Sequence, residues 1–514
     1  MTFGIYLRQF VALAILIAAT ARADDRPNIV LIIGDDIGFS DIGCFGAEID
    51  TPNLDKLAAN GMRFSQGYNM AKCNPTRSAM LTGTLLGGPE CQSMGGLLGK
   101  AGYTTLYAGK EHFDSWVPLE RLTAMNSFDK SFCHYGGCGN FFSYQPVEIH
   151  LNEKLLTQEE VEASTTKPYY KTNAYTDAAL RFLDETKDDG KPFFLYMPYE
   201  SAHYPLQALP EDYEKFEERY KVGWDVIRDQ RFAKQKEMGL IAEDTKLSPF
   251  EGETKTPYVP WNELSAENQQ RRIEEAAGYA AMVHALDRSI GRIVDKIESR
   301  GELDNTLILF LSDNGGCGIP GKTKNWLHPT DPESWRSPHA VWGEVSGTPF
   351  RKFKQAGNEG GARTHLMAHW PAKIAPNQIC HEVAHLVDFM PTFLEVAKAK
   401  YPKKQDGKPT PKLDGLSLMP LFEGKDRPDH ELLITGWTES KRAIRQGDWK
   451  LVNEGKNWKL FNMASDPTEL NDLAKQMPEK AESLHKAYAD WRAARPYLPE
   501  KQQTQKPYVG SDGV

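Results

Sequence analysis

The sequence lacks four features that would each place it in a familiar class of proteins. It has no excess of positive charge, since 61 Lys and Arg stand against 70 Asp and Glu. This net charge of −9 argues against a nucleic-acid partner, because such partners require a basic surface. It has no low-complexity segment and no internal repeat, and beyond the N-terminal run no apolar stretch could span a bilayer. What remains is a globular chain of 514 residues, long enough for two domains.

The N-terminus has the pattern of an export signal. Arg8 precedes the apolar run Phe10–Ala19, and Ala21-Arg22-Ala23 has the small-x-small form of a cleavage site. We therefore predict a signal peptide over residues 1–23 and a mature chain that begins at Asp24. The protein would then be periplasmic or secreted, without a stable membrane anchor. A membrane anchor or a buried first helix is the alternative interpretation of the same run.

Cysteine is scarce, and the count of seven is odd. An exported protein can form disulfides, but an odd count leaves at least one thiol unpaired. Cys133 and Cys138 are close enough in the sequence to pair, although the sequence does not settle the connectivity. Several buried free thiols are the alternative. The cysteines occupy positions 44, 73, 91, 133, 138, 317 and 380.

The long N-terminal part alternates apolar strands with amphipathic helices, which is typical of a sheet built from βαβ units. Asn28–Ile33 is apolar after its first residue, as expected for a strand covered on both faces. Further strands are predicted at Tyr103–Ala108, Phe193–Met197 and Thr306–Leu311. A helix between the last two strands ends at Arg300-Gly301, a typical C-cap.

The composition changes after about Ala399. Lys400–Lys412 is rich in Pro, Lys and Gly and predicts a linker or an exposed loop. Beyond it, a helix is predicted near Ala474–Ala494, after four short strands at Leu432–Thr435, Arg442–Arg445, Trp449–Val452 and Trp458–Phe461. The fold class is therefore α/β, with a mostly parallel sheet domain over residues 24–400 and a smaller antiparallel sheet and helix over residues 401–514.

Side chains that could bind a ligand or transfer a proton follow each of the four main strands. Asp35-Asp36 follows the first strand, Lys110 and His112 the second, His203 the third and Asp313-Asn314 the fourth. Open parallel sheets bind their ligands at the carboxyl ends of the strands. If the four strands are parallel, these seven side chains share one edge of the sheet.

The acids and the amide of this set provide only hard oxygen ligands, which suit Ca²⁺ or Mg²⁺ rather than zinc. Three carboxylates crowded together without a cation would repel one another and raise at least one pKa. In isolation such turns are usually solvated, but two of them directly after buried strands favour a metal site. We predict that Asp35, Asp36, Asp313 and Asn314 bind Ca²⁺, with Mg²⁺ as the less favoured ion.

The stretch from Cys73 to Gly83 is the most specific in the chain. Asn74 suits a helix N-cap, Pro75 the first helical position and Gly83 the end of the helix. Cys73 would then lie at a helix N-terminus, where backbone N–H groups and the dipole favour an anion. A thiolate there would be reactive, yet soft sulfur is a poor ligand for a hard cation. This mismatch indicates that the cysteine does not act as a thiol.

The sequence Cys73-x-Pro75-x-Arg77, followed by Leu81-Thr82-Gly83, resembles the signature of type I sulfatases, in which the cysteine is oxidised to formylglycine. The resemblance covers most of the chain and is strongest to bacterial arylsulfatase-like members. The other motifs also stand in the order that is found in the family. They are Asp35-Asp36, Gly109-Lys110-x-His112, Ser201-Ala202-His203-x-Pro205, Ser312-Asp313-Asn314-Gly315-Gly316, and Arg351-x-x-Lys354 before Glu359-Gly360-Gly361-x-Arg363.

This resemblance implies an alkaline-phosphatase-like α/β/α sandwich and the hydrolysis of sulfate esters, with a sulfated carbohydrate as substrate and aryl sulfates as surrogates. It also implies that formylglycine at position 73 joins the four oxygen ligands on Ca²⁺, and that a formylglycine-generating enzyme acts on the chain during maturation. Once hydrated, the aldehyde carries two hydroxyls on one carbon. One attacks sulfur and deprotonation of the other expels sulfate, which a plain serine could not do.

The resemblance implies a role for each remaining site residue. Arg77 and Lys110 would neutralise and orient the diol. His112 would be the base for its second hydroxyl, a role that suits a tunable imidazole. His203 and Lys354 would contact the sulfate and protonate or stabilise the leaving oxygen.

Three of the motifs depart from the family pattern. Glu111 stands where an aromatic residue is common, Ala202 replaces a proline, and Thr364-His365 replaces a residue-proline pair. None removes a catalytic group, but they weaken any inference about the substrate. Two other functions stay open: hydrolysis of phosphate diesters or phosphonate monoesters with the same nucleophile, and non-catalytic binding of sulfated glycans.

Overall fold

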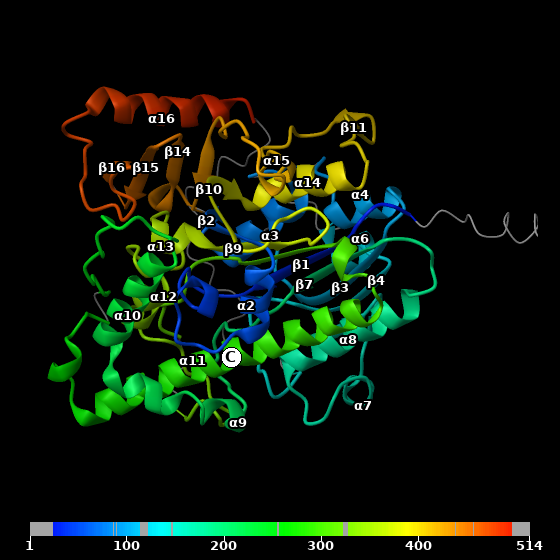
Figure 1. Cartoon of the computed structure of the whole chain (residues 1–514), viewed down its shortest axis with the longest axis horizontal. Coiled ribbons are helices and arrows are strands. Elements are labelled where there is room, and N and C mark those ends of the chain that lie inside the picture. The colour runs from blue at the N-terminus through cyan, green and yellow to red at the C-terminus, as the bar shows by residue number, and fades with distance from the viewer. Residues whose placement is uncertain are drawn as a thin grey trace, which may run out of the picture.

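A ten-stranded mixed sheet forms the centre of the protein in this computed structural model (Figure 1). The structure describes residues 24–85, 87–88, 90–113, 122–144, 148–253, 256–321, 327–436, 438–455 and 457–495, so the signal peptide predicted over residues 1–23 lies outside it. The spatial order of the strands is β10-β2-β9-β8-β1-β7-β3-β4-β5-β6. Their bounds are β1 Asn28–Gly34, β2 Met62–Tyr68, β3 Thr104–Glu111, β4 Lys130–Tyr135, β5 Ile149–Leu151, β6 Lys154–Leu155, β7 Phe193–Pro198, β8 Thr306–Ser312, β9 Arg363–His369 and β10 Gln378–His385.

The four strands predicted to carry the site are neighbours, and they run parallel. β1 pairs with both β7 and β8, and β3 pairs with β7. In register, Gly34 at the end of β1 lies beside Ser312 at the end of β8, and Ile33 lies beside Pro198. The predicted fold class is confirmed, and the loops that follow these strands start from one edge of the sheet. The strand predicted to end at Ala108 continues to Glu111, so Lys110 lies inside β3.

Helices cover both faces of the sheet, which makes it the middle layer of an α/β/α sandwich (Figure 1). Successive side chains of a strand point to opposite faces, and β1 shows this directly. Val30 and Ile32 pack in the core that contains α8 (Lys171–Thr186) and α11 (Ala266–Ser299), whereas Leu31 and Ile33 pack in the core that contains α3 (Cys73–Thr82) and α14 (Phe389–Val396). No described helix, α11 included, is long and apolar enough to cross a membrane.

The helices of the protein have the following bounds. The α-helices are α2 Pro52–Ala59, α3 Cys73–Thr82, α4 Met94–Lys100, α6 Ala124–Ser127, α7 Gln158–Ala163, α8 Lys171–Thr186, α9 Pro210–Tyr213, α10 Trp224–Glu237, α11 Ala266–Ser299, α12 Ala340–Ser346, α13 Glu359–Ala362, α14 Phe389–Val396, α15 Met419–Phe422 and α16 Pro478–Ala493. The 3₁₀ helices are η1 Gly43–Phe45, η2 Glu217–Val222, η3 Trp261–Glu263, η4 Leu303–Asn305, η5 Leu386–Asp388 and η6 Glu439–Lys441. Helix α11 ends where predicted, with Arg300 as C-cap and Gly301 at a φ of 69°.

A four-stranded antiparallel sheet follows in the C-terminal part, as predicted, and α16 lies against it (Figure 1). Its strands are β13 Leu433–Thr435, β14 Ala443–Gln446, β15 Trp449–Glu454 and β16 Asn457–Asn462. Ile434, Ile444 and Leu451 of this sheet pack in the same core as α3 and α14. The predicted linker contains a two-stranded ladder, β11 Lys404–Gln405 with β12 Lys408–Pro409.

None of the seven cysteines forms a disulfide in the described structure. The pairing considered for Cys133 and Cys138 is therefore not formed. Cys133 points into the core from β4, where burial raises the pKa of its thiol well above the ordinary value. Such a thiol is a small apolar side chain rather than a reactive group.

Candidate active site

Asp35 follows β1 and is held by two buried cations. Its Oδ2 accepts hydrogen bonds from Nζ of Lys110 at 2.5 Å and from Arg77 at 3.2 Å. All three side chains are fully buried. Burial favours the neutral acid, but the surrounding cations, Lys110 first, outweigh it and hold the pKa of Asp35 well below its ordinary value. Asp35 is therefore an ionised carboxylate.

Asp36 adopts a φ of 63° and meets a different set of partners. Its Oδ1 accepts from Nζ of Lys354 at 2.6 Å and from the amide of Asn314 at 2.7 Å. Its Oδ2 lies 3.6 Å from Nε2 of His203. Lys354, Asn314 and His203 thus converge on a single carboxylate, although they are separated by long stretches of sequence.

Asp313 follows β8 and pairs with the guanidinium group of Arg77. Nε of Arg77 donates to Oδ2 of Asp313 at 2.9 Å, and an Nη atom lies 2.7 Å from the same oxygen, with both side chains fully buried. Because Arg77 also reaches Asp35, it bridges the two acids. Burial and the charge of Asp35 still raise the pKa of Asp313 well above its ordinary value. The lysines and the arginine therefore do not fully offset the negative charge of the three acids, and an additional cation would be favourable at this place.

Cys73 is the first residue of α3, one turn before Arg77 on the same helix. The helix starts earlier than predicted, because Lys72 rather than Asn74 is its N-cap residue, while Gly83 ends it at a φ of 68° as expected. The thiol is buried, and its sulfur lies 3.3 Å from Nδ1 of His112. Burial, with the charges of Lys110 and Arg77, lowers the pKa of His112 well below its ordinary value. The imidazole beside residue 73 is therefore neutral and able to accept a proton.

His203 is also a buried, neutral imidazole. Its Nδ1 lies 2.6 Å from the carbonyl oxygen of Tyr204, and its ring stacks on that of Tyr204 at a centroid distance of 4.5 Å. Burial lowers its pKa despite the opposing charge of Asp36. Among the described residues, ligand atoms of Asp35, Asp36 and His203 lie within 4.8 Å of one another. Sequence reasoning assigned His203 to the sulfate and did not foresee that it would lie so close to both acids.

Three buried oxygen atoms of the cluster lack a hydrogen-bond partner among the described residues: Oδ1 of Asp35, Oδ2 of Asp36 and Oδ1 of Asn314. Buried polar atoms are almost always bonded, so three of them in one place require an explanation. A hard divalent cation fits this donor set, because its preferred ligands are carboxylate and amide oxygens.

The loop that carries Lys354 is fastened to the loop after β8 by close backbone contact. The N–H of Gly315 donates to the carbonyl oxygen of Gly361 at 2.9 Å, and a Cβ on Gly315 would lie 1.9 Å from the carbonyl oxygen of Gly360. These glycines therefore permit an approach that other residues would block. The neighbouring Arg363 is structural, since it bonds Ser65 and Glu359 and does not enter the cluster.

A second buried charge cluster, which sequence reasoning missed, lies beside the first. Glu200 pairs with Lys171 at 3.0 Å, approaches Nε2 of His134 at 3.2 Å, and accepts from the N–H of Gly139 at 2.7 Å. Its only sequence signal was the position of Glu200 just before the Ser201–His203 motif. Glu111, the departure from the family pattern, is likewise buried and accepts a hydrogen bond from the N–H of Ala124, and burial raises its pKa to about 8.

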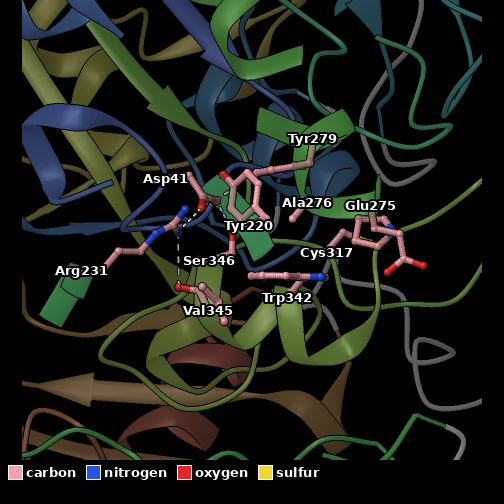
Figure 2. Close-up of a pocket in the computed structure, with 11 residues that line it drawn as sticks. Asp41, Tyr220, Arg231, Glu275, Ala276, Tyr279, Cys317, Trp342, Val345 and Ser346 are labelled. Atoms are coloured by element: carbon pink, nitrogen blue, oxygen red, sulfur yellow. Dashed lines mark hydrogen bonds and ion pairs between the residues drawn. The ribbon is translucent and has the colours of Figure 1, made fainter. Parts of the chain in front are cut away.

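Near the loop of Asp36 lies a small, partly open cavity of about 20 Å³, whose lining combines Asp41, Arg231 and Tyr279 with apolar side chains such as Trp342 and Val345 (Figure 2). The hydroxyl of Tyr279 lies 3.0 Å from the backbone oxygen of Asp36 and 2.7 Å from a carboxylate oxygen of Asp41, and Arg231 points toward Asp41 at 2.6 Å. The volume suits about one water molecule and excludes a sugar. The cavity therefore supports the loop of Asp36 and is not a substrate site.

The sandwich, with its buried cluster of acids, lysines and histidines at the carboxyl ends of parallel strands, defines a hydrolase of the alkaline-phosphatase-like fold. Family models agree: residues 27–399 match the model described as Sulfatase, and residues 353–493 match N-sulphoglucosamine sulphohydrolase, C-terminal. The chain belongs to the type I sulfatase family and is a sulfuric ester hydrolase.

Individual relatives support this assignment. An uncharacterized sulfatase of Schizosaccharomyces pombe is 30% identical, over 88% of this chain and 91% of that protein. An arylsulfatase of Klebsiella aerogenes is 29% identical, over 81% of this chain and 97% of that protein. The crystal structure of Ps i-CgsB in complex with k-i-k-neocarrahexaose superposes with a TM-score of 0.66 at 24% identity, covering 95% of this chain and 96% of that one, which shows the shared fold.

Proposed function

We propose that this sulfatase hydrolyses sulfate esters of carbohydrates with a formylglycine derived from Cys73 and a bound Ca²⁺ ion. One observation carries the proposal: the oxygen atoms that could bind a cation lie beside the residue that would become the nucleophile. Three unpartnered oxygens of buried acids and an amide lie among the same side chains that surround the start of α3. An oxygen nucleophile at position 73 would suit these neighbours, whereas a thiolate would not.

Asp35, Asp36, Asp313 and Asn314 would hold the cation, together with the side chain at position 73. Ca²⁺ is favoured over Mg²⁺ because it accepts irregular sets of six to eight oxygen ligands, whereas Mg²⁺ demands near-octahedral geometry and keeps several waters. When bound, the ion supplies Lewis-acid polarisation of a sulfate oxygen and fixes the position of the ester.

The hydrated formylglycine supplies two hydroxyls on one carbon, one as the nucleophile for sulfur and one whose deprotonation releases sulfate. The surrounding residues prepare position 73 for this chemistry. Nδ1 of His112, which lies 3.3 Å from the side chain there, accepts the proton of the second hydroxyl. Arg77 and Lys110 keep Asp35 ionised and provide positive charge beside the nucleophile.

On the other side of the cluster, Lys354 and His203 both converge on Asp36. We assign them to the sulfate and to the leaving oxygen. Nζ of Lys354 is a permanent cation, because burial is outweighed by Asp36 and the pKa of its ammonium group is raised well above the ordinary value. It therefore stabilises negative charge. His203 lies beside Asp36 as well, and only its protonated form could pass a proton to the leaving oxygen.

Carbohydrate esters are the proposed substrates for two reasons. Relatives that cover most of this chain include N-acetylgalactosamine-6-sulfatases, such as the mouse enzyme at 26% identity. The first structural relative was crystallised with a neocarrahexaose. We further propose export after removal of residues 1–23 to the periplasm or the medium, maturation by a formylglycine-generating enzyme, and a division into residues 24–400 and 401–514.

The decisive experiment is to produce the protein with and without a formylglycine-generating enzyme and to measure the mass of the peptide containing residue 73 in both preparations. Each is assayed with an aryl sulfate, an aryl phosphodiester and an aryl phosphonate. We expect aryl sulfate turnover only in the converted preparation, with the highest kcat/KM of the three substrates. Cys73→Ser in a host without serine maturation is the matched control and should be inactive.

Other outcomes would identify the competing functions. A higher kcat/KM for the phosphodiester or the phosphonate would make sulfate ester hydrolysis the side activity. Persistence of cysteine after co-production with the maturation enzyme, together with binding of sulfated glycans, would support a non-catalytic binding protein. Equal activity with cysteine or serine at position 73 would refute the formylglycine mechanism.

A further inference from the structure

An open groove of about 700 Å³ leads away from the cluster toward the C-terminal sheet. Lys354, which bonds Asp36, lines its inner end. Ser440, Lys441 and Asn453 line it on the side of the C-terminal sheet, and the loops at 318–320 and 352–358, which lie between β8 and β9, line it on the other side. A volume of this size is in the range of clefts that bind small organic ligands. It is far larger than the cavity of about 20 Å³ near the loop of Asp36.

Lysines are distributed along this groove. Lys354 is engaged with Asp36, and Lys352 pairs with Glu251. Lys441 differs from both: its Nζ donates to the amide oxygen of Gln355 at 3.0 Å, and its side chain is exposed. Glu253 lines the same groove and its charge acts on Lys441, but no described carboxylate forms an ion pair with this lysine. Lys441 is therefore a cation at the groove wall that no described acid binds directly.

The positive charge of Lys441 is also repelled by that of Lys72, the residue just before Cys73. Lys72 directly precedes Cys73, and its charge acts on both His112 and Lys441. The residues packed around Lys441 lower the pKa of its ammonium group although the side chain keeps exposed surface, the charge of Glu253 opposes this effect, and the charge of Lys72 adds to it. An anion bound directly to Lys441 would relieve this repulsion, whereas Glu253 forms no ion pair with it.

We propose that the groove binds the part of the substrate beyond the cleaved ester, and that Lys441 binds a second anionic group, a sulfate or a carboxylate, on a neighbouring sugar. The substrate is then an oligosaccharide with at least two anionic groups rather than a singly sulfated monosaccharide. The inference rests on the proposed function, because it places the cleaved ester at residue 73. It also gives the C-terminal sheet a part in substrate selection.

Three labelled tetrasaccharides test the proposal by fluorescence anisotropy: κ-carrageenan, whose anions are all sulfates, hyaluronan, whose anions are all carboxylates, and neutral neoagarotetraose. The protein is produced without the maturation enzyme, so that it binds these ligands without turnover. Lys441→Ala should weaken binding of one or both anionic tetrasaccharides about tenfold and reduce the salt dependence of Kd. The matched control is Lys486→Ala, which removes an exposed lysine of α16 that pairs with Asp490. It should bind like the wild type.

The binding results test the proposed site at Lys441, and the turnover results test the proposed function separately. A loss confined to κ-carrageenan assigns a sulfate, and a loss confined to hyaluronan assigns a carboxylate. Equal Kd values for wild type and Lys441→Ala, or binding of neoagarotetraose as tight as that of the anionic probes, overturn the proposal, as does the absence of binding by all three. Turnover of a small aryl sulfate by the matured protein should be unchanged in Lys441→Ala, because that substrate does not reach the C-terminal sheet. Failure of the matured wild type to hydrolyse the aryl sulfate would refute the proposed function instead.

Discussion

The ammonium nitrogen of Lys110 lies 2.5 Å from Oδ2 of Asp35, with both side chains fully buried. The other oxygen of Asp35, Oδ1, has no hydrogen-bond partner among the described residues. The same division recurs at Asp36, where Oδ1 accepts from Lys354 and Oδ2 has no hydrogen bond within the described structure. Each acid is thus held by a lysine through one oxygen and leaves the second one available to the proposed cation.

Asp36→Asn tests that division directly. The change removes one negative charge from the proposed ligand set and keeps the shape of the side chain, so the affinity for Ca²⁺ should fall about 100-fold. A ligand that binds only the folded state raises thermal stability, so Ca²⁺ should raise the Tm of the wild type more than that of the variant. Calcium titrations followed by calorimetry and by Tm measure both effects. Asp295→Asn, an exposed position on α11, serves as the control. An identical Ca²⁺-induced rise in all three proteins would contradict the assignment.

Arg77→Lys tests whether the shape of the guanidinium group matters beyond its charge. A lysine retains the cation, but its single nitrogen cannot bond Asp313 and Asp35 in the way that Nε and Nη of Arg77 do. We expect the variant to fold and kcat for an aryl sulfate to fall about 100-fold, because the start of α3 loses its fixed position relative to both acids. Arg77→Ala should instead be severely destabilised, by about 3–5 kcal/mol, since it leaves buried acids without their cation. Circular dichroism and Tm separate the two effects, and full activity of Arg77→Lys would show that charge alone suffices.

Much of the fold could be predicted because its signals are local. The apolar run of β1 and the turn residues after it define a buried strand with acids at its end, and parallel pairing with β7 and β8 follows from the βαβ pattern. The observed differences are at element ends. Helix α3 begins at Cys73 instead of after Asn74, and β3 continues through Lys110, because tertiary contacts override capping preferences by one or two residues.

The remaining features of the site depend on contacts between distant segments. Nothing in the sequence near Glu200 indicates that Lys171 and His134 would pair with it, since the three residues come from different elements. The approach of Lys441 to the groove requires the C-terminal sheet to be docked, which no local pattern specifies. Lys354 was predicted only through the resemblance, and its bond to Asp36 joins residues 318 positions apart.

His365 should make the protein sensitive to acid. Its ring is fully buried against Phe310, and burial lowers its pKa to about 4. The unfolded state, with an ordinary pKa near 6.5, binds the proton more readily, so the stabilisation is complete above pH 6.5 and is lost as the pH falls toward about 4. At pH 5 the loss is about 2 kcal/mol for this residue. His365→Phe should therefore show a smaller fall in Tm between pH 7 and pH 5 than the wild type. His485→Phe, at an exposed position on α16, should keep the wild-type slope, and equal slopes in all three proteins would exclude His365 as a cause.

The pair formed by Glu200 and Lys171 offers a test of the second charge cluster. Both side chains are buried, and their charged atoms lie 3.0 Å apart. Glu200→Gln keeps an oxygen for the N–H of Gly139 but leaves the ammonium group of Lys171 unpaired, so it should destabilise the protein by about 3–5 kcal/mol. Lys171→Met leaves the carboxylate unpaired and should be destabilising by a similar amount.

The double variant Glu200→Gln/Lys171→Met removes both charges, and its stability should return to within about 2 kcal/mol of the wild type, because a buried ion pair adds little net free energy over neutral side chains. Urea unfolding of the four proteins yields the coupling free energy of the cycle. If the losses in free energy of unfolding are additive in the double variant, Glu200 and Lys171 do not stabilise each other. The contacts of Glu200 with His134 and Gly139 would then account for the stability of the cluster. A stable double variant with lowered kcat for an aryl sulfate would show that the pair also positions the loop of His203, since Glu200 lies three residues before that histidine.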